Sequence, residues 1–260
     1  MDDKIRLEIL SNRFQAIVDE MAQIISRTAH TVFVKETQDY GSVLVSRHGE
    51  VFAAPRRYGV LMMIGMPMEG ALDYIGDDIE EGDIFISNDP ESTRGMCTHL
   101  SDVYLWKPIF VDGQLLCWAW SFIHVSDIGG RVPGSIAPSS HEVFQEGIRI
   151  TPQKLFHAGE LYVPLRDMIL ANCRTPDQNW GDMQACLAGL STSETRVTEL
   201  VNQYGFDTVD RSVDAVLNYA ETQSRRVISH VPDGTYHYVD YIEADMVGLG
   251  LIRIKVAMTI

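Results

Sequence analysis

The sequence predicts an α+β protein with a long N-terminal helix, a mixed but largely antiparallel β-sheet that includes a buried hairpin, a helical hairpin near residues 176–230, and C-terminal strands. Three observations predict this class. Apolar residues recur at helical spacing over residues 3–30, two strand-like runs flank Asp112-Gly113, and helical periodicity returns beyond these runs. With 260 residues, 45% of them hydrophobic, the chain can bury a substantial core. We expect one domain over residues 1–260.

The N-terminal half changes from helical to strand periodicity. Apolar positions from Ile5 to Ile25, with charges between them, predict one amphipathic helix over residues 3–30. The segment "SVLVSRHGEVFAA" predicts two short strands around a turn at His48-Gly49, and "GDIFISNDP" predicts a strand that ends at an Asn-Asp-Pro breaker. Between them, "PMEGALDYIG" predicts a helix.

The clearest strand signal is a hairpin over residues 103–125. Asp112-Gly113 separates the runs "VYLWKPIFV" and "QLLCWAWSFIHV", and both turn residues tolerate the positive φ that a type I′ turn requires. Both runs are apolar at nearly every position instead of alternating with polar residues. We therefore expect both faces of the hairpin to be covered.

Beyond the hairpin, "DIGGRVPGSIAPSS" is a loop by composition, and helical periodicity follows it. We expect a helix in "ELYVPLRDMILANC", a second helix from about residue 179 that ends at Gly205, and a third to about residue 228 with Asp207 or Thr208 as its N-cap. The tail segments "GTYHYVDYIEAD" and "GLGLIRIKVAMTI" predict strands.

The composition excludes several classes of function. The formal net charge is −15, the sequence pI is about 4.8 and no Lys/Arg run occurs, so we expect no nucleic-acid partner. The start, "MDDKIRLEIL", lacks the apolar run of a signal peptide, and no segment has about 20 uninterrupted apolar residues. We therefore expect a cytoplasmic protein without a membrane partner. The four cysteines lack C-x-x-C spacing, which favours reduced, mostly buried thiols, although Cys97 lies two residues before His99.

Two H-x-S-D segments are the best candidates for a chemical site. "THLSDV" contains His99 and Asp102, and "IHVSDIGG" contains His124 and Asp127. The H-x-x-D spacing alone does not identify a site, because it also occurs at His230 and His237. The hairpin supplies the missing context, since it brings both H-x-S-D segments to the same end of two paired strands.

The register of the hairpin decides which side chains face one another. A two-residue turn pairs residues whose numbers add to 225, which places His124 opposite Ser101. A one-residue bulge or a longer loop shifts this sum to 226 and places Asp102 opposite His124, and Pro108 inside the strand is consistent with such an irregularity. His99 would then turn back across the strand end to join them.

Two histidines and a carboxylate are a recognisable set of metal ligands. They can hold Zn²⁺, Mn²⁺ or Fe²⁺ and leave positions open for water or substrate. The alternative, that each histidine only hydrogen-bonds a nearby Ser or Asp, stays open. Four further residues each have a chemical and an ordinary structural interpretation: Asp39 as a fourth ligand, Asp127 as an acceptor that orients an imidazole, Glu146 as a general base, and Arg131 in "GGRVPGS" as part of an anion site.

At these residues the chain resembles a known family. The similarity runs in order through "GDIFISNDP", "THLSDV", "WKPIFVDGQLLCWA", "IHVSDIGGRVPGS", "EVFQEGIRITPQKLF" and "VPDGTYHYVD", and extends from about residue 5 to the end. These blocks are similar to the B-type subunits of the hydantoinase B and 5-oxoprolinase group, which includes subunits of acetone and acetophenone carboxylases and of caprolactamase. The family usually has Pro where Ser101 stands, and a glycine-rich turn where this chain has "ESTRGMC".

The resemblance implies a bound divalent metal with ligands that match His99, Asp102 and His124, and with Asp39 near the site as a less secure correspondence. It also implies a hetero-oligomer in which a separate A-type subunit binds ATP and activates a small-molecule substrate. B-type subunits are much longer than this chain, and the last predicted strand reaches Ile260 without a terminating signal. We therefore expect a hydantoinase B-like domain that is incomplete at its C-terminus.

Three functions follow from these expectations. The first is the metal-bearing B-type subunit of an ATP-dependent hydrolase of cyclic amides such as hydantoins, 5-oxoproline or lactams. The second is a subunit of an ATP-dependent ketone carboxylase, which would use the same residues. The third is a non-catalytic assembly module in which the histidines are structural.

Overall fold

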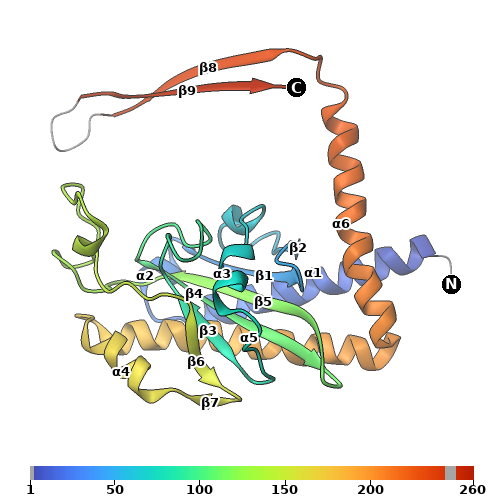
Figure 1. Ribbon diagram of the computed structural model, residues 1–260, viewed down its shortest axis with the longest axis horizontal. Coiled ribbons are helices and arrows are strands. Elements are labelled where there is room, and N and C mark those ends of the chain that lie inside the picture. The colour runs from blue at the N-terminus through green and yellow to red at the C-terminus, as the bar shows by residue number, and fades with distance from the viewer. Residues whose placement is uncertain (1–2, 244–249) are drawn as a thin grey trace.

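The computed structural model describes residues 3–243 and 250–260, and it has the α+β architecture that the sequence predicts. The two longest helices cover one face of an antiparallel sheet, a short helix lies on the other face, and a separate two-stranded hairpin extends from the end of the last helix (Figure 1). The helices are α1 (Asp3–Thr28), α2 (Val32–Lys35), α3 (Glu69–Ile75), α4 (Val163–Ala171), α5 (Pro176–Tyr204) and α6 (Phe206–Ile228), with 3-10 turns η1 (Leu61–Met63) and η2 (Val143–Gln145). The strands are β1 (Tyr40–Ser46), β2 (Val51–Ala53), β3 (Ile84–Ser87), β4 (Asp102–Val111), β5 (Gln114–His124), β6 (Gln153–His157), β7 (Glu160–Leu161), β8 (Thr235–Ile242) and β9 (Ile252–Thr259).

The main sheet has seven strands in the order β2-β1-β5-β4-β3-β6-β7. Every pairing among these described strands is antiparallel, so the sheet is not mixed. Side chains alternate across it. On β5, Ala119 and Ile123 face the core that α1 and α5 cover, whereas Trp118 and Trp120 face a second core beneath α3. Two covered faces explain why the hairpin strands are apolar at nearly every position.

The β4–β5 hairpin contains the predicted irregularity. Asp112 and Gly113 both have positive φ, of 52° and 75°, as a type I′ turn requires. The register shifts between Ile109 and Phe110, so that the paired numbers add to 226 along the rest of the hairpin. The alternative with a bulge is therefore confirmed. A shift of one residue reverses which side chains share a face, and this one sets the partner of every residue at the far end of the hairpin.

The helices differ from the sequence prediction in detail. Glu160 and Leu161 form β7 against β6, so helix α4 begins only at Val163. The expected N-cap at Asp207 or Thr208 is wrong, because α6 already begins at Phe206. Gly205, at φ 83°, ends α5 and starts α6 without an intervening loop, which a positive-φ glycine permits. Helix α5 packs along α1, whereas α6 turns away from the sheet (Figure 1).

The hairpin of β8 and β9 forms a separate arm at the end of α6 (Figure 1). Its strands pair with each other, and every residue of both strands is exposed. The predicted strands over 234–245 and 248–260 form here, although residues 244, 245, 248 and 249 lie outside the described residues. Among the residues that the structure describes, no helix is both long and apolar enough to cross a lipid bilayer.

Candidate metal centre

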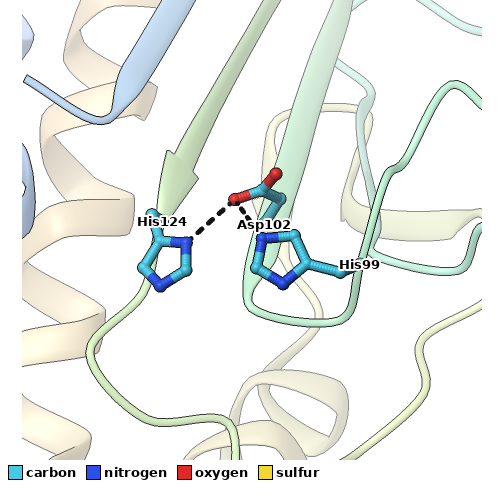
Figure 2. Close-up of side chains that lie close together, drawn as sticks. All are labelled: His99, Asp102 and His124. Carbon is cyan, nitrogen blue, oxygen red and sulfur yellow. Dashed lines mark hydrogen bonds and ion pairs between the residues drawn. The ribbon is translucent and has the colours of Figure 1, made fainter. Parts of the chain in front are cut away.

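The structure brings His99, Asp102 and His124 together at one end of the β4–β5 hairpin (Figure 2). Asp102 is the first residue of β4, and His124, the last residue of β5, is its direct partner in the register. Oδ1 of Asp102 lies 3.1 Å from Nδ1 of His124 and 3.1 Å from Nε2 of His99. One donor atom from each of the three side chains lies within 4.8 Å of the other two.

His99 reaches this cluster because the chain turns just before β4. The amide of Asp102 donates to the carbonyl of His99 at 3.2 Å, which closes the turn, and the amide of Val125 donates to the carbonyl of Ser101 at 2.8 Å. The two imidazole rings end with their centroids 5.1 Å apart. His99 thus lies outside the strand and folds back over its end, as the sequence analysis required.

Burial and charge differ among the three side chains. Those of Asp102 and His124 are 5% and 4% exposed, whereas that of His99 is 36% exposed. Burial alone raises the pKa of Asp102, but the hydrogen bonds with His124 and His99 outweigh it and bring the pKa to about 2. The hydrogen bond to Asp102 in turn raises the pKa of His99. The cluster therefore holds a carboxylate anion between two imidazoles and is open to solvent on the His99 side.

The donor set fits a divalent transition metal. Oδ1 of Asp102 faces both imidazoles, and its other oxygen, Oδ2, accepts a hydrogen bond from Thr98 Oγ1 at 2.7 Å. The Nε2 atom of His124 is buried and has no hydrogen-bond partner among the described residues. Two imidazoles and one carboxylate, with an outer hydroxyl that orients the carboxylate, are typical ligands for Zn²⁺, Mn²⁺ or Fe²⁺.

Asp39 lies beside this cluster without belonging to it. Its Oδ2 atom is 3.6 Å from Nδ1 of His124, and its side chain is 38% exposed. The backbone carbonyl of Asp39 accepts a hydrogen bond from the amide of His124 at 3.0 Å, which extends the β1–β5 pairing. Burial, together with repulsion from Asp102, raises the pKa of the Asp39 carboxyl. A small movement of the Asp39 side chain would therefore bring a second carboxylate into the cluster of His99, Asp102 and His124.

Asp127 and Arg131, two further candidates from the sequence, make hydrogen bonds within the loop after β5. Asp127 does not orient an imidazole: its carboxylate accepts hydrogen bonds from the amides of Gly129, Gly134 and Arg174 and from the Arg174 guanidinium, which organise the following loop. Arg131 donates to the carbonyl of Ser139. Those two side chains therefore support the loop.

Cys97 is fully buried, and burial raises the pKa of its thiol to about 12. A thiol with that pKa stays protonated near neutral pH, and the thiolate is the nucleophilic form. Cys97 is therefore unsuited to nucleophilic chemistry. All four cysteines are free thiols, as predicted.

A buried asparagine that the sequence analysis treated only as a strand breaker supports the site. Nδ2 of Asn88 donates to the carbonyl of Leu100 at 2.7 Å and to that of Ile148 at 2.9 Å, and its Oδ1 accepts from the amide of Ile150 at 2.7 Å. Next to it, Asp89 pairs with Arg149 at 2.7 Å. These contacts fasten the turn that bears His99 to the segment before β6.

Phe33 is a second residue that sequence reasoning missed. It lies on the short helix α2, and its ring centroid is 4.9 Å from that of the His124 imidazole. The half-buried ring thus forms an apolar wall beside the cluster. Its only signal in the sequence is its position a few residues before Asp39.

The chain is similar in sequence to subunits of known enzymes. The chain is 29% identical to caprolactamase subunit beta of Pseudomonas jessenii over 99% of its own length, and 25% identical to the acetophenone carboxylase delta subunit of Aromatoleum aromaticum over 96%. It spans 44% and 36% of the lengths of these two relatives.

The crystal structure of the ATP-dependent caprolactamase from Pseudomonas jessenii superposes with a TM-score of 0.85 at 28% identity. This superposition covers 97% of the present chain and 44% of the caprolactamase chain. Residues 3–260, nearly the whole chain, match the family described as hydantoinase B/oxoprolinase. The fold, the order of the sequence blocks and this match agree, and the chain belongs to the hydantoinase B/oxoprolinase family.

Proposed function

We propose that this chain carries the metal centre of a B-type subunit that acts in the ATP-dependent hydrolysis of a small cyclic amide. The cluster of His99, Asp102 and His124 is the observation that carries the proposal, because its donor atoms all lie within 4.8 Å of one another. The similarity to a caprolactamase subunit supports the class of substrate. The chain spans less than half of that relative, so the activity proposed is that of the whole subunit.

Each residue has a defined part in this proposal. His99 and His124 present imidazole nitrogens, and Asp102 supplies the negative charge that offsets the charge of a divalent cation. Thr98 holds the second oxygen of Asp102 and so keeps the first directed at the imidazoles. Asp39 would complete the ligand set or accept a proton at the exposed side. A bound Zn²⁺, Mn²⁺ or Fe²⁺ would supply Lewis-acid activation of water or of the amide carbonyl.

The proposal includes a partner. We propose that the protein works in a hetero-oligomer in which an A-type subunit binds ATP and supplies the phosphoryl activation of the substrate. The similarity to subunits of a caprolactamase and of a carboxylase supports this assembly.

A second candidate function is ATP-dependent carboxylation of a ketone, favoured by the similarity to the acetophenone carboxylase delta subunit. The two reactions differ in what they consume. Ring opening of a lactam or hydantoin without bicarbonate supports the hydrolase, whereas ketone-dependent consumption of bicarbonate supports the carboxylase.

Metal analysis of the purified chain tests the site itself. We expect about one equivalent of transition metal per chain, and loss of most of it in His124→Ala. His48→Ala is the matched control, because His48 lies exposed in the turn between β1 and β2. A wild-type chain without stoichiometric metal after incubation with Zn²⁺ and Mn²⁺, or a His124→Ala chain that binds metal like wild type, would leave only the assembly-module interpretation.

A further inference from the structure

We propose that Glu146 is a positioning residue whose carboxylate holds the turn that bears His99 in the geometry of the metal centre. The inference rests on the proposed function, since it concerns the same site. From the sequence alone Glu146 is a candidate general base, but in the structure its carboxylate accepts a hydrogen bond from a backbone amide of the turn that bears His99.

The central contact joins Glu146 to the residue after His99. Oε2 of Glu146 accepts a hydrogen bond from the amide of Leu100 at 3.2 Å, although 46 residues separate the two in the chain. Leu100 is fully buried, and among the described residues no other acceptor takes its amide hydrogen. A charged acceptor makes a stronger bond to an amide than a neutral one does. Glu146 therefore satisfies a buried donor within the turn between two proposed ligands.

The turn is held from two sides. The carbonyl of Leu100 accepts from Asn88, and its amide donates to Glu146, so both backbone groups of one residue are anchored by side chains distant in sequence. With Leu100 held, the orientation of His99 relative to Asp102 has little freedom, because the amide of Asp102 also bonds to the His99 carbonyl. Loss of the Glu146 bond would let this short segment rotate.

Backbone contacts within the loop between β5 and β6 fix the position of Glu146. Glu146 follows the 3-10 turn η2, and its amide donates to the carbonyl of Val143 at 3.0 Å. Gly130, at φ 74°, lies directly against this backbone, and a Cβ there would collide with the carbonyl oxygen of Glu146. The amide of Arg131 also donates to the carbonyl of Gln145 at 2.9 Å. The Gly-rich segment after β5 thus forms the support on which Glu146 rests, which gives "DIGGR" a role in the site.

The test compares Glu146→Ala, Glu146→Gln and Glu142→Ala. Gln keeps an oxygen that can accept from Leu100, and Glu142 is an exposed carboxylate on the same loop. Two readouts are measured: hydrogen exchange of the Leu100 amide in metal-free protein by NMR, and affinity for Zn²⁺ by competition with a chelator. For Glu146→Ala we expect the amide to exchange at least about tenfold faster and the affinity to fall by about 10–100-fold. Glu146→Gln should retain most of both properties, and Glu142→Ala should match wild type.

Two results would overturn the proposal. Unchanged Leu100 exchange in Glu146→Ala would show that the contact does not hold the turn, and faster exchange with unchanged Zn²⁺ affinity would show that the contact is only structural. Failure of the proposed function is distinguishable, because it appears as absent metal binding in wild type. In that case the exchange rate of Leu100 and the ring chemical shifts of His99 in metal-free Glu146→Gln and Glu146→Ala still decide whether Glu146 positions His99.

Discussion

Asp102 lies directly opposite His124 in the antiparallel pair of β4 and β5, and its carboxylate contacts the imidazole at 3.1 Å. This pairing depends on the bulge between Ile109 and Phe110, near the other end of the hairpin. Without the extra residue, His124 would face Ser101, and the Asp102 side chain would emerge on the opposite face of the sheet. A backbone irregularity about seven pairs away therefore determines whether the two proposed ligands meet.

The hydroxyl of Thr98 should control how well Asp102 serves as a ligand. Thr98→Val keeps the shape of the side chain but removes the 2.7 Å bond to Asp102 Oδ2, so the carboxylate can rotate. We expect the affinity for Zn²⁺ to fall by about 10–100-fold, as measured by chelator competition. Thr222→Val, at an exposed position of α6, is the control. Equal affinities in the two variants would mean that Thr98 does not orient the ligand.

Asn88 should matter more for stability than any exposed polar residue. It is fully buried, and its side chain makes three hydrogen bonds to backbone groups of two other segments. Asn88→Ala leaves these groups without their partner, so we expect the free energy of unfolding to fall by about 3 kcal/mol. Urea denaturation measures this change. Asn12→Ala, at an exposed position of α1, should change the free energy of unfolding by less than about 0.5 kcal/mol. A similarly small effect of Asn88→Ala would show that the three hydrogen bonds of Asn88 do not stabilise the fold.

The hairpin could be predicted from the sequence because its signals are local. The turn at Asp112-Gly113 and the apolar runs beside it indicate which strands pair, and counting from the turn leaves only two registers. The choice between these registers needed the structure, since Pro108 suggests an irregularity without fixing its place. His99, Asp102 and His124 could therefore be grouped before any tertiary information, whereas their role as metal ligands is still a prediction.

The support of the site could not be predicted, because it depends on contacts between distant segments. Asn88 bonds to Ile148 and Ile150 across about 60 residues of chain, and Glu146 bonds to Leu100 across 46. No local pattern distinguishes such an asparagine from one that only ends a strand. Asp127 illustrates the reverse case: its spacing from His124 suggested a site, but the carboxylate is occupied by loop amides and Arg174.

The Asp127 carboxylate should make stability depend on pH in the acid range. Burial raises its pKa, but the bonds from Arg174, Gly129 and Gly134 outweigh this effect and hold the pKa below the ordinary value of 3.8. A pKa that is lower in the folded state stabilises the protein above the unfolded value, and this contribution is lost as pH falls through the folded value. We therefore expect the urea midpoint to decrease from pH 5 to pH 3, and to decrease less in Asp127→Asn.

The control for this pH dependence is Asp167→Asn. The Asp167 side chain is 60% exposed and pairs only with its neighbour Arg166 among the described residues, so its removal should leave the acid dependence as in wild type. A steeper or unchanged dependence in Asp127→Asn would show that the loop carboxylate is not a source of acid sensitivity.

The arm formed by β8 and β9 should be the least protected β-structure of this chain. One face of the hairpin is mostly apolar and includes the cross-strand pairs Tyr238 with Val256 and Ile242 with Ile252, yet Tyr238 and Val256 are 66% and 49% exposed. An isolated two-stranded hairpin is marginal in water, whereas the opening of a buried strand requires nearly the whole free energy of unfolding. We expect hydrogen-bonded amides of the arm to exchange at least roughly a thousandfold faster than those of β5. Exchange measured by NMR at low protein concentration tests this directly, and protection of the arm equal to that of β5 would mean that its apolar face is covered in solution.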